Sequence, residues 1–147
     1  MNEENIIIEK AKNGFNRNLL LDNYHKIHSD DKELKKLIEL FHVEKKKNYL
    51  DLGTGNGYVA FELAKFNKEV NVNGLDIAEK AIQRNKEISL ENGINNIKFD
   101  VYDGLNIPYE DSSFDGVISR LAIHHFPDIK NTIKQIDRIL KKMEKSS

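Results

Sequence analysis

Hydrophobic and polar positions along the chain follow two alternating periods. Short segments with a period near two, typical of strands, are separated by segments with a period near 3.6, typical of helices. The expected strands cover residues 48–52, 70–76, 97–101 and 114–119, and the expected helices begin at Asp30, at Tyr58, just after Asp76 and near Ile129. This alternating order favours a parallel sheet with right-handed crossovers. We therefore predict an α/β domain of three layers, with helices on both faces of the sheet.

Two of these segments are predicted in more detail. The helix after Asp76 carries an apolar stripe through Ala78, Ala81, Ile82 and Ile88, and it should end at Asn92-Gly93, which is a typical C-terminal cap. By contrast, the first thirty residues give a weak pattern, in which the short apolar run Ile6-Ile7-Ile8 is the clearest feature.

A glycine-rich turn follows the first strand of the expected sheet. It reads Asp51-Leu52-Gly53-Thr54-Gly55-Asn56-Gly57. Glycines let the backbone turn sharply and approach a ligand at the N-terminus of the next helix, which in open α/β sheets is where nucleotides bind. The next strand closes with Asp76, whose two oxygens can accept hydrogen bonds from both hydroxyls of a ribose. The spacing predicts an adenosine-containing ligand, although Asp76 could instead be a helix-start charge favoured by the helix dipole.

The residues around the turn narrow the choice of ligand. The dinucleotide fingerprint G-x-G-x-x-G requires a third glycine where this chain has Tyr58, and no Gly-Lys-Ser/Thr follows as in a phosphate-binding P-loop. The turn also begins with the carboxylate of Asp51, which would repel a pyrophosphate but suits an ammonium group. We therefore expect a positively charged ligand, and a nicotinamide dehydrogenase is a distant alternative.

Composition excludes several classes of function. The 147 residues hold 23 Lys and Arg against 24 Asp and Glu, for a net charge of −1, and Lys45-Lys46-Lys47 is the only basic cluster, so no nucleic-acid partner is expected. The absence of cysteine excludes disulfides, thiolate zinc sites and cysteine nucleophiles. No pair of residues has the spacing of a helical zinc site, so we predict no metal. No stretch approaches the roughly 20 apolar residues of a membrane span, and the start lacks a secretory profile, so we expect a cytoplasmic protein.

Four segments together resemble the class I (Rossmann-like) S-adenosylmethionine-dependent methyltransferases. Within that family they are most similar to the small-molecule group related to the ubiquinone/menaquinone C-methyltransferases. The segments are residues 51–57, Gly74-Leu75-Asp76-Ile77, Asp103-Gly104 ahead of Ile107-Pro108-Tyr109, and Ser113-Phe114-Asp115 leading to residues 119–126. The resemblance implies methyl transfer from S-adenosylmethionine to an unidentified small-molecule acceptor. The alternative is a cofactor-binding module without turnover on its own, completed by a partner or by further C-terminal sequence.

The resemblance also implies roles for individual residues. Gly53, Gly55 and Gly57 would line the methionine part of the cofactor, together with Thr54 and Asn56 of the same turn, and Asp51 would lie near its amino group. Asp76 would bind the ribose, and Ile77 would pack on the adenine. Asp103 would accept the adenine amino hydrogen with Gly104 nearby, and Ser119 and Arg120 would contribute backbone near the methionine end. From the residues alone, Asp103 is equally an ordinary turn residue.

No catalytic residue is identified by the sequence. The candidates are the adjacent His124 and His125, for which packing or capping is the more common role, and Tyr24. In the family, N-terminal segments cover the substrate. We therefore interpret residues 1–30 as a lid-like segment and residues 31–147 as a Rossmann-like core within one domain.

The chain is short relative to the family's seven-stranded fold. Family members usually continue with a fifth strand, another helix and an antiparallel pair, and the fifth strand lies beside the one expected here at residues 114–119. Without that neighbour, this strand would present unpaired backbone groups, which template pairing with another chain. We therefore predict a homo-oligomer formed through the 114–119 edge, with Ile6-Ile7-Ile8 folding back as a substitute strand as the intramolecular alternative.

Overall fold

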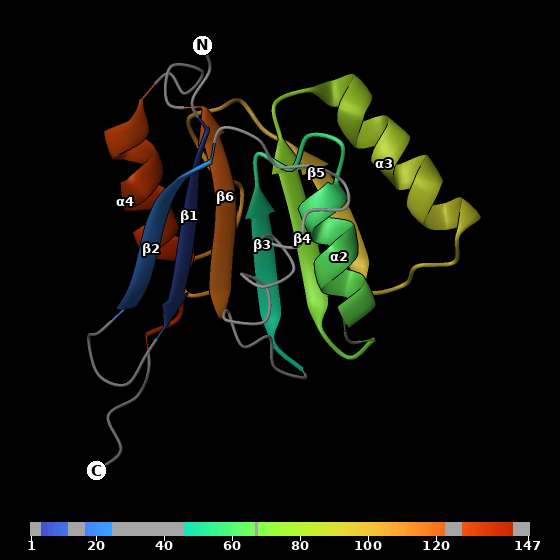
Figure 1. The fold of residues 1–147 in the computed structure, drawn as a ribbon, viewed down its shortest axis with the longest axis horizontal. Helices are drawn as coiled ribbons and strands as arrows, with labels where there is room; N and C mark the ends of the chain where they lie inside the picture. The colour runs from blue at the N-terminus through green and yellow to red at the C-terminus, as the bar shows by residue number, and fades with distance from the viewer. Residues whose placement is uncertain (1–3, 12–16, 25–45, 67, 123–127, 143–147) are drawn as a thin grey trace.

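A computed structural model of the chain describes residues 4–11, 17–24, 46–66, 68–122 and 128–142. Its strands form one sheet, in the order β2-β1-β6-β3-β4-β5, flanked by helices (Figure 1). The strands are β1 (Glu4–Ala11), β2 (Arg17–Tyr24), β3 (Asn48–Leu52), β4 (Asn71–Asp76), β5 (Ile97–Val101) and β6 (Gly116–Ala122). The helices are α2 (Tyr58–Phe66), α3 (Glu79–Glu91) and α4 (Ile129–Ile139). The helix expected from Asp30 lies outside the described residues.

Four neighbouring strands, in the order β6-β3-β4-β5, are parallel, as the alternating pattern predicts. β3 pairs with β4 and β6, and β4 pairs with β5, all in parallel. Consequently the carboxyl ends of these four strands meet at one edge of the sheet. In Figure 1, α2 and α3 lie in front of the sheet and α4 lies behind it. The predicted three-layer α/β arrangement is therefore confirmed.

The sheet separates two hydrophobic cores because successive strand residues point to opposite faces. Within β3, Tyr49 packs into the core beneath α2 and α3, and Leu50 packs into the core beneath α4. The first core holds Tyr49, Val59, Ala60, Leu63, Ala64, Val70, Val72, Ile82, Ile97, Phe99 and Ile118. The second holds Leu50, Leu52, Leu75, Ile107, Phe114, Val117, Ile136, Ile139 and Leu140.

The N-terminal hairpin occupies the place beside β6 that the sequence analysis left open. β1 pairs antiparallel with β6, with Ile7 opposite Ser119 and Ile8 opposite Ile118, and β2 pairs antiparallel with β1 on its outer side. The substitute strand at Ile6-Ile7-Ile8 is therefore confirmed. Among the described residues the outer strands of the sheet are β2 and β5, so the unpaired 114–119 edge does not exist, and the predicted homo-oligomer loses its premise.

Two further differences concern boundaries. Residues 4–11 and 17–24 are strands of the sheet, where we predicted a lid-like segment over residues 1–30, because the apolar run gains a full backbone ladder on β6. The strand expected at 114–119 begins instead at Gly116, and Phe114 forms an isolated parallel bridge with Leu140 at the end of α4.

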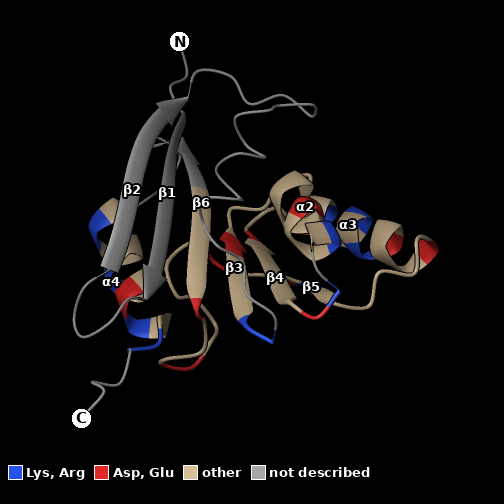
Figure 2. Ribbon diagram, turned by 60° about the horizontal axis from the view of Figure 1, so that its bottom comes forward, with Lys and Arg blue, Asp and Glu red and all other residues tan. Residues whose placement is uncertain are grey.

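Charged residues of both signs are interspersed along α3 and α4 in Figure 2. Neither helix presents a surface of a single sign. None of the helices within the described ranges is long and apolar enough to cross a membrane.

Candidate functional site

The turn between β3 and α2 depends on its glycines. Gly53, Gly55 and Gly57 have φ angles of 76°, 54° and 78°, a region that side chains other than glycine rarely adopt. The N–H groups of Gly53 and Thr54 both donate to the Leu75 carbonyl, at 2.7 and 2.9 Å. The turn is therefore fastened to the end of the neighbouring strand β4, where a tight connection is possible only because the chain can enter the left-handed region.

Asp76 joins the turn to the start of α3. Its Oδ2 accepts a hydrogen bond from the Gly55 N–H at 2.7 Å, and its Oδ1 accepts one from the Ala78 N–H at 2.9 Å. The carboxylate is half-buried. Each carboxylate oxygen has two lone pairs, so these bonds leave acceptor capacity on both oxygens. The structure thus brings Asp76 and the glycine turn together, as their spacing predicts, and Asp76 also serves the helix start.

The remaining polar residues of the turn form hydrogen bonds with neighbouring residues of the chain. Asp51 is only 1% exposed, and its Oδ2 accepts a hydrogen bond from the buried Thr54 hydroxyl at 2.7 Å. A buried carboxylate needs such donors because transfer out of water disfavours its charge. Asn56 is exposed and accepts from the Tyr58 N–H at 3.0 Å, which caps the start of α2. Asp51 therefore supplies buried negative charge directly before the turn, which suits a cation.

Asp103 shapes the loop that follows β5. Its Oδ1 accepts from the N–H groups of Leu105 and Asn106 at 2.8 and 2.7 Å, and these bonds, with one from the Asn106 side chain, hold the pKa of Asp103 below its ordinary value of 3.8. Gly104 is buried, with a φ of 87°. The turn-residue interpretation of Asp103 is therefore satisfied in the structure, and its contact with adenine stays a prediction.

Tyr102 links this loop to Asp76. Its N–H donates to the Asp76 carbonyl at 3.0 Å. The pKa of the Tyr102 hydroxyl is raised to about 12, first by burial and then by the negative charges of Asp76 and Asp103. Asp76 and Asp103, the two carboxylates predicted to bind the cofactor, therefore both raise the pKa of one half-buried side chain, which the sequence analysis did not single out.

The other predicted residues lie at the same edge or outside the described residues. The Ser119 hydroxyl is buried and donates to the Leu52 carbonyl at 2.7 Å, directly before the turn. Arg120 follows in β6, opposite Ile6 of β1. Tyr24 ends β2 and shares a row of the sheet with Ala122, through Glu4. His124 and His125 fall in the segment 123–127, outside the described residues.

Exposed apolar side chains occur beside Asp76 and in the loop after β5. Ile77 is 56% exposed, and Val101 and Leu105 are 43% and 44% exposed. Val101 lies directly opposite Asp76 in the β4–β5 ladder. A Cβ atom added at Gly55 would meet no atom of the described residues within 4 Å, so the turn is open at this point. An open turn, an acceptor carboxylate and an apolar surface fit an adenosine-containing group.

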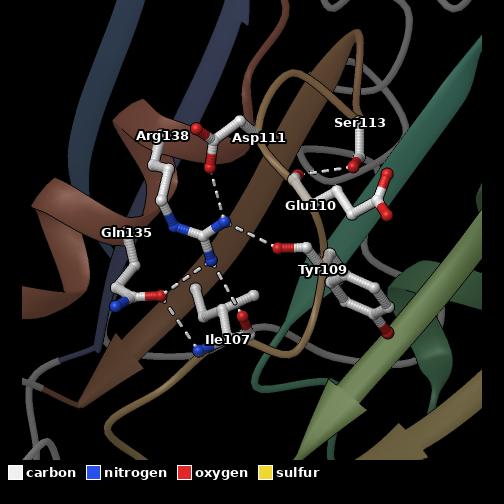
Figure 3. Close-up of polar contacts among 7 residues, drawn as sticks. All are labelled: Ile107, Tyr109, Glu110, Asp111, Ser113, Gln135 and Arg138. Atoms are coloured by element: carbon white, nitrogen blue, oxygen red, sulfur yellow. Dashed lines mark hydrogen bonds and ion pairs between the residues drawn. The ribbon is translucent and has the colours of Figure 1, made fainter.

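An arginine from α4 holds the loop that continues after Asp103-Gly104 (Figure 3). The Arg138 guanidinium donates to the carbonyls of Tyr109 and Ile107 at 2.7 and 2.9 Å. It also contacts Gln135 Oε1 at 3.0 Å and Asp111 Oδ1 at 2.9 Å. Gln135 in turn accepts from the Ile107 N–H at 3.0 Å. No local sequence pattern predicts this clamp, because its members lie on separate elements.

The described residues hold no group of three His, Asp or Glu side chains that could bind a metal ion. A cavity of about 470 Å³ lies at the opposite, amino edge of the sheet, between the end of α2 and the segment joining α3 to β5. It is lined by Ala64, Lys65, Lys68, Asn92, Gly93, Ile94, Asn95 and Asn96. It is separate from the site at the carboxyl edge.

Comparison with known proteins gives consistent matches. A family model described as a methyltransferase domain matches residues 43–145. The ubiquinone/menaquinone biosynthesis C-methyltransferase UbiE of Rickettsia bellii is 34% identical over 103 residues, covering 67% of this chain and 42% of that protein. Human EEF1A lysine methyltransferase 2 is 39% identical over 100 residues, covering 63% of this chain and 42% of that protein.

Among solved structures, YcgJ of Bacillus subtilis is similar to this chain with a TM-score of 0.65 and 27% sequence identity, over 74% of this chain and 45% of that one. A SAM-dependent methyltransferase from Aquifex aeolicus has a TM-score of 0.67 at 21% identity, over 74% of this chain and 58% of that one, and supports the fold. The chain spans less than half the length of the curated relatives named above.

Proposed function

The chain belongs to the methyltransferase-domain family of S-adenosylmethionine-dependent enzymes, and on this premise we propose that its carboxyl-edge site binds S-adenosylmethionine and supports methyl transfer to a small-molecule acceptor. One observation carries the proposal. The Gly55 N–H contacts Asp76 Oδ2 at 2.7 Å, which joins the turn at the end of β3 to the acidic end of β4. A ligand with a ribose and a cationic chain needs both features at one place.

The residues of the site divide between the parts of the cofactor. Asp76 presents acceptor oxygens for the ribose hydroxyls, and Ile77 offers an exposed apolar surface for the adenine. Asp103 and Gly104 supply the far side of the adenine pocket. The backbone of Gly53 to Gly57, with Thr54 and Asn56, lines the methionine part, and the buried charge of Asp51 favours its ammonium group. The backbone of Ser119 and Arg120 borders the same end.

The chemistry requires little of the protein beyond placement. When bound, the cofactor supplies a methyl group activated by a positively charged sulfur. Positioning of two reactants supplies about 7–11 kcal/mol of such a displacement barrier. The protein therefore needs no dedicated acid or base, and His124, His125 and Tyr24 remain candidates for a supporting role.

The acceptor and the setting belong to the same proposal. UbiE is named for quinone biosynthesis and the human relative for a protein lysine. The names of the relatives therefore include both a small-molecule acceptor and a protein acceptor. The alternative is a cofactor-binding module that needs a partner or further sequence for turnover, and the share of its relatives that the chain spans supports it. The proposal includes a cytoplasmic setting.

Calorimetric titration tests the cofactor assignment. We expect binding of S-adenosylmethionine and S-adenosylhomocysteine and weaker binding of NAD, and tighter binding of NAD would overturn the assignment. Asp76→Ala should weaken S-adenosylhomocysteine binding by about 1.5–3 kcal/mol, because a charge-assisted acceptor is lost. Glu87→Ala, which removes an exposed carboxylate from α3, is the charge-matched control. Normal binding by Asp76→Ala would reduce Asp76 to a helix-start charge.

A second measurement separates the enzyme from the binding module. The chain alone is incubated with methyl-labelled S-adenosylmethionine and a panel of small-molecule acceptors and protein lysines. Label transfer to a small molecule supports the proposal. Binding without transfer to any acceptor supports the alternative, and transfer only to protein lysine contradicts the acceptor class.

A further inference from the structure

A polar side chain is buried on the inner face of α3, where an apolar one is expected. The buried residues of this helix are Ile82, Asn85 and Ser89, and Asn85 is only 1% exposed. Burial of an amide is costly unless it finds a hydrogen-bond partner. The partner is the glycine turn, because Asn85 Nδ2 donates to the Gly55 carbonyl oxygen at 2.8 Å.

Gly55 is thereby held at both of its backbone groups. Its N–H donates to Asp76 Oδ2 at 2.7 Å, and its carbonyl accepts from Asn85. These two bonds lie on either side of the Gly55 Cα atom, where φ is 54°. They therefore restrain both backbone torsions of the residue at which the turn is open.

Asn85 also packs against the next glycine of the turn. A Cβ atom built at Gly57 would lie 3.2 Å from Asn85 Cγ, so the amide sits directly against the backbone at that position. A longer side chain at position 85 would press on this backbone, and a carboxylate would face the Gly55 carbonyl without a proton to donate. The position therefore requires a short, neutral donor.

We propose that Asn85 is a positioning residue for cofactor binding, which holds Gly55 so that its N–H fixes the Asp76 carboxylate for the ribose hydroxyls. The proposal rests on the proposed function and extends it, because none of the four segments that identify the family contains Asn85. It also gives α3 a role in ligand recognition beyond covering the sheet.

The first test compares three proteins by titration with S-adenosylhomocysteine. Asn85→Ala should bind about 5- to 10-fold more weakly than the unmodified chain, which is the usual net effect of one hydrogen bond. Ser89→Ala is the matched control, since Ser89 is buried on the same face and, among the described residues, its hydroxyl bonds within α3, to the Lys86 carbonyl. We expect its affinity to stay within about 2-fold of the unmodified chain.

A double-mutant cycle separates positioning from a general structural role. If Asn85 acts through Gly55 and Asp76, adding Asn85→Ala to Asp76→Ala should lower affinity by less than about 2-fold beyond Asp76→Ala alone. Fully additive losses would overturn the inference. If Asn85→Ala does not fold, Asn85→Leu, which is nearly isosteric and cannot donate, is measured in the same cycle.

The outcomes distinguish the two proposals. No binding of S-adenosylhomocysteine by the unmodified chain contradicts the proposed function itself. Binding by the unmodified chain with unchanged affinity in the Asn85 variants overturns the role of Asn85 and leaves the proposed function standing. Weaker binding in the Asn85 variants, with coupling to Asp76, supports both.

Discussion

The two loops at the carboxyl edge of the sheet are stabilised in different ways. The glycine turn, residues 53–57, is held by backbone groups and by Asp76 at the end of the neighbouring strand. The longer loop, residues 102–113, is held by Arg138 and Gln135, which lie about thirty positions further along the chain. The first loop is stabilised mainly by its own backbone and its strand neighbour, with one amide from α3 at Asn85. The second depends on two side chains of α4, which lies further along the chain.

The difference indicates where the site is rigid and where it can vary. A turn that needs left-handed backbone at three glycines tolerates few substitutions, which suits the part of the site that we propose binds the cofactor. A loop clamped by one guanidinium can change in length and sequence, provided its carbonyls still meet Arg138. The contrast can be tested through stability and through charge.

The largest effect is expected for Gly57→Ala. The new Cβ would lie 2.8 Å from Phe61 Cε2 and 3.2 Å from Asn85 Cγ, at a φ of 78°. Strain in the left-handed region and overpacking together should lower the free energy of unfolding by about 2–5 kcal/mol. The control is Gly93→Ala, with a φ of 63° and no described atom within 4 Å, for which strain alone costs about 1–2 kcal/mol. Urea unfolding measures both, and equal losses would contradict the crowding at Gly57.

A smaller effect is expected for Arg138→Met. This change keeps much of the apolar stem but removes the donors to the Ile107 and Tyr109 carbonyls, so the free energy of unfolding should fall by about 2–3 kcal/mol. Asp111→Asn should change it by less than about 1 kcal/mol, because the Asp111 carboxylate is mostly exposed. Hydrogen exchange locates the change: faster exchange confined to residues 105–113 supports the clamp, and an effect spread over the glycine turn would show that the two loops are not independent.

The smallest effect concerns the pKa of Tyr102, which the charges of Asp76 and Asp103 both raise. Because the pKa of Tyr102 is raised from 10.0 to about 12, the neutral hydroxyl is favoured in the folded state. Its contribution to stability is therefore complete below pH 10 and is lost as the pH rises from 10 to about 12. Asp76→Asn should lower the pKa of Tyr102 only part of the way back, since burial is the first cause. Ultraviolet titration, with Tyr102→Phe to assign the transition, measures the shift, and an unchanged pKa would place Asp76 too far away to act.

The sequence predicted the parallel part of the fold well and the inner face of α3 poorly. The spacing of hydrophobic positions along the chain located β3, β4, β5 and the three described helices. It assigned Ala78, Ala81, Ile82 and Ile88 to one face of α3, whereas Ile82, Asn85 and Ser89 are buried. Burial there is decided by the hydrogen bond from Asn85 to Gly55 in another element, and no apolar pattern records such a bond.

The candidate site was predictable where chemistry is local. The glycines and Asp76 follow from spacing, because a strand end, a turn and a helix start impose fixed residue types. The places of Asp103 and Ser119 rested on resemblance, and their roles are still untested. Asn85 and Arg138 were missed because each is one polar residue on an amphipathic helix, and its partner becomes visible only when the chain is folded.

Pairing of the N-terminal hairpin, formed by β1 and β2, with β6 also sets the order in which parts of the sheet form during synthesis. β1 and β2 are adjacent in the sequence, so their hairpin can form within about 1–10 μs. Its partner is remote, since Glu4 lies opposite Ala122. At a synthesis rate of roughly 5–20 residues per second, β6 leaves the ribosome on the order of ten seconds after β1. Until β6 is synthesised, the backbone groups of β1 that pair with β6 therefore lack that partner. Docking of the hairpin on β6 is expected to be the last step that completes the sheet.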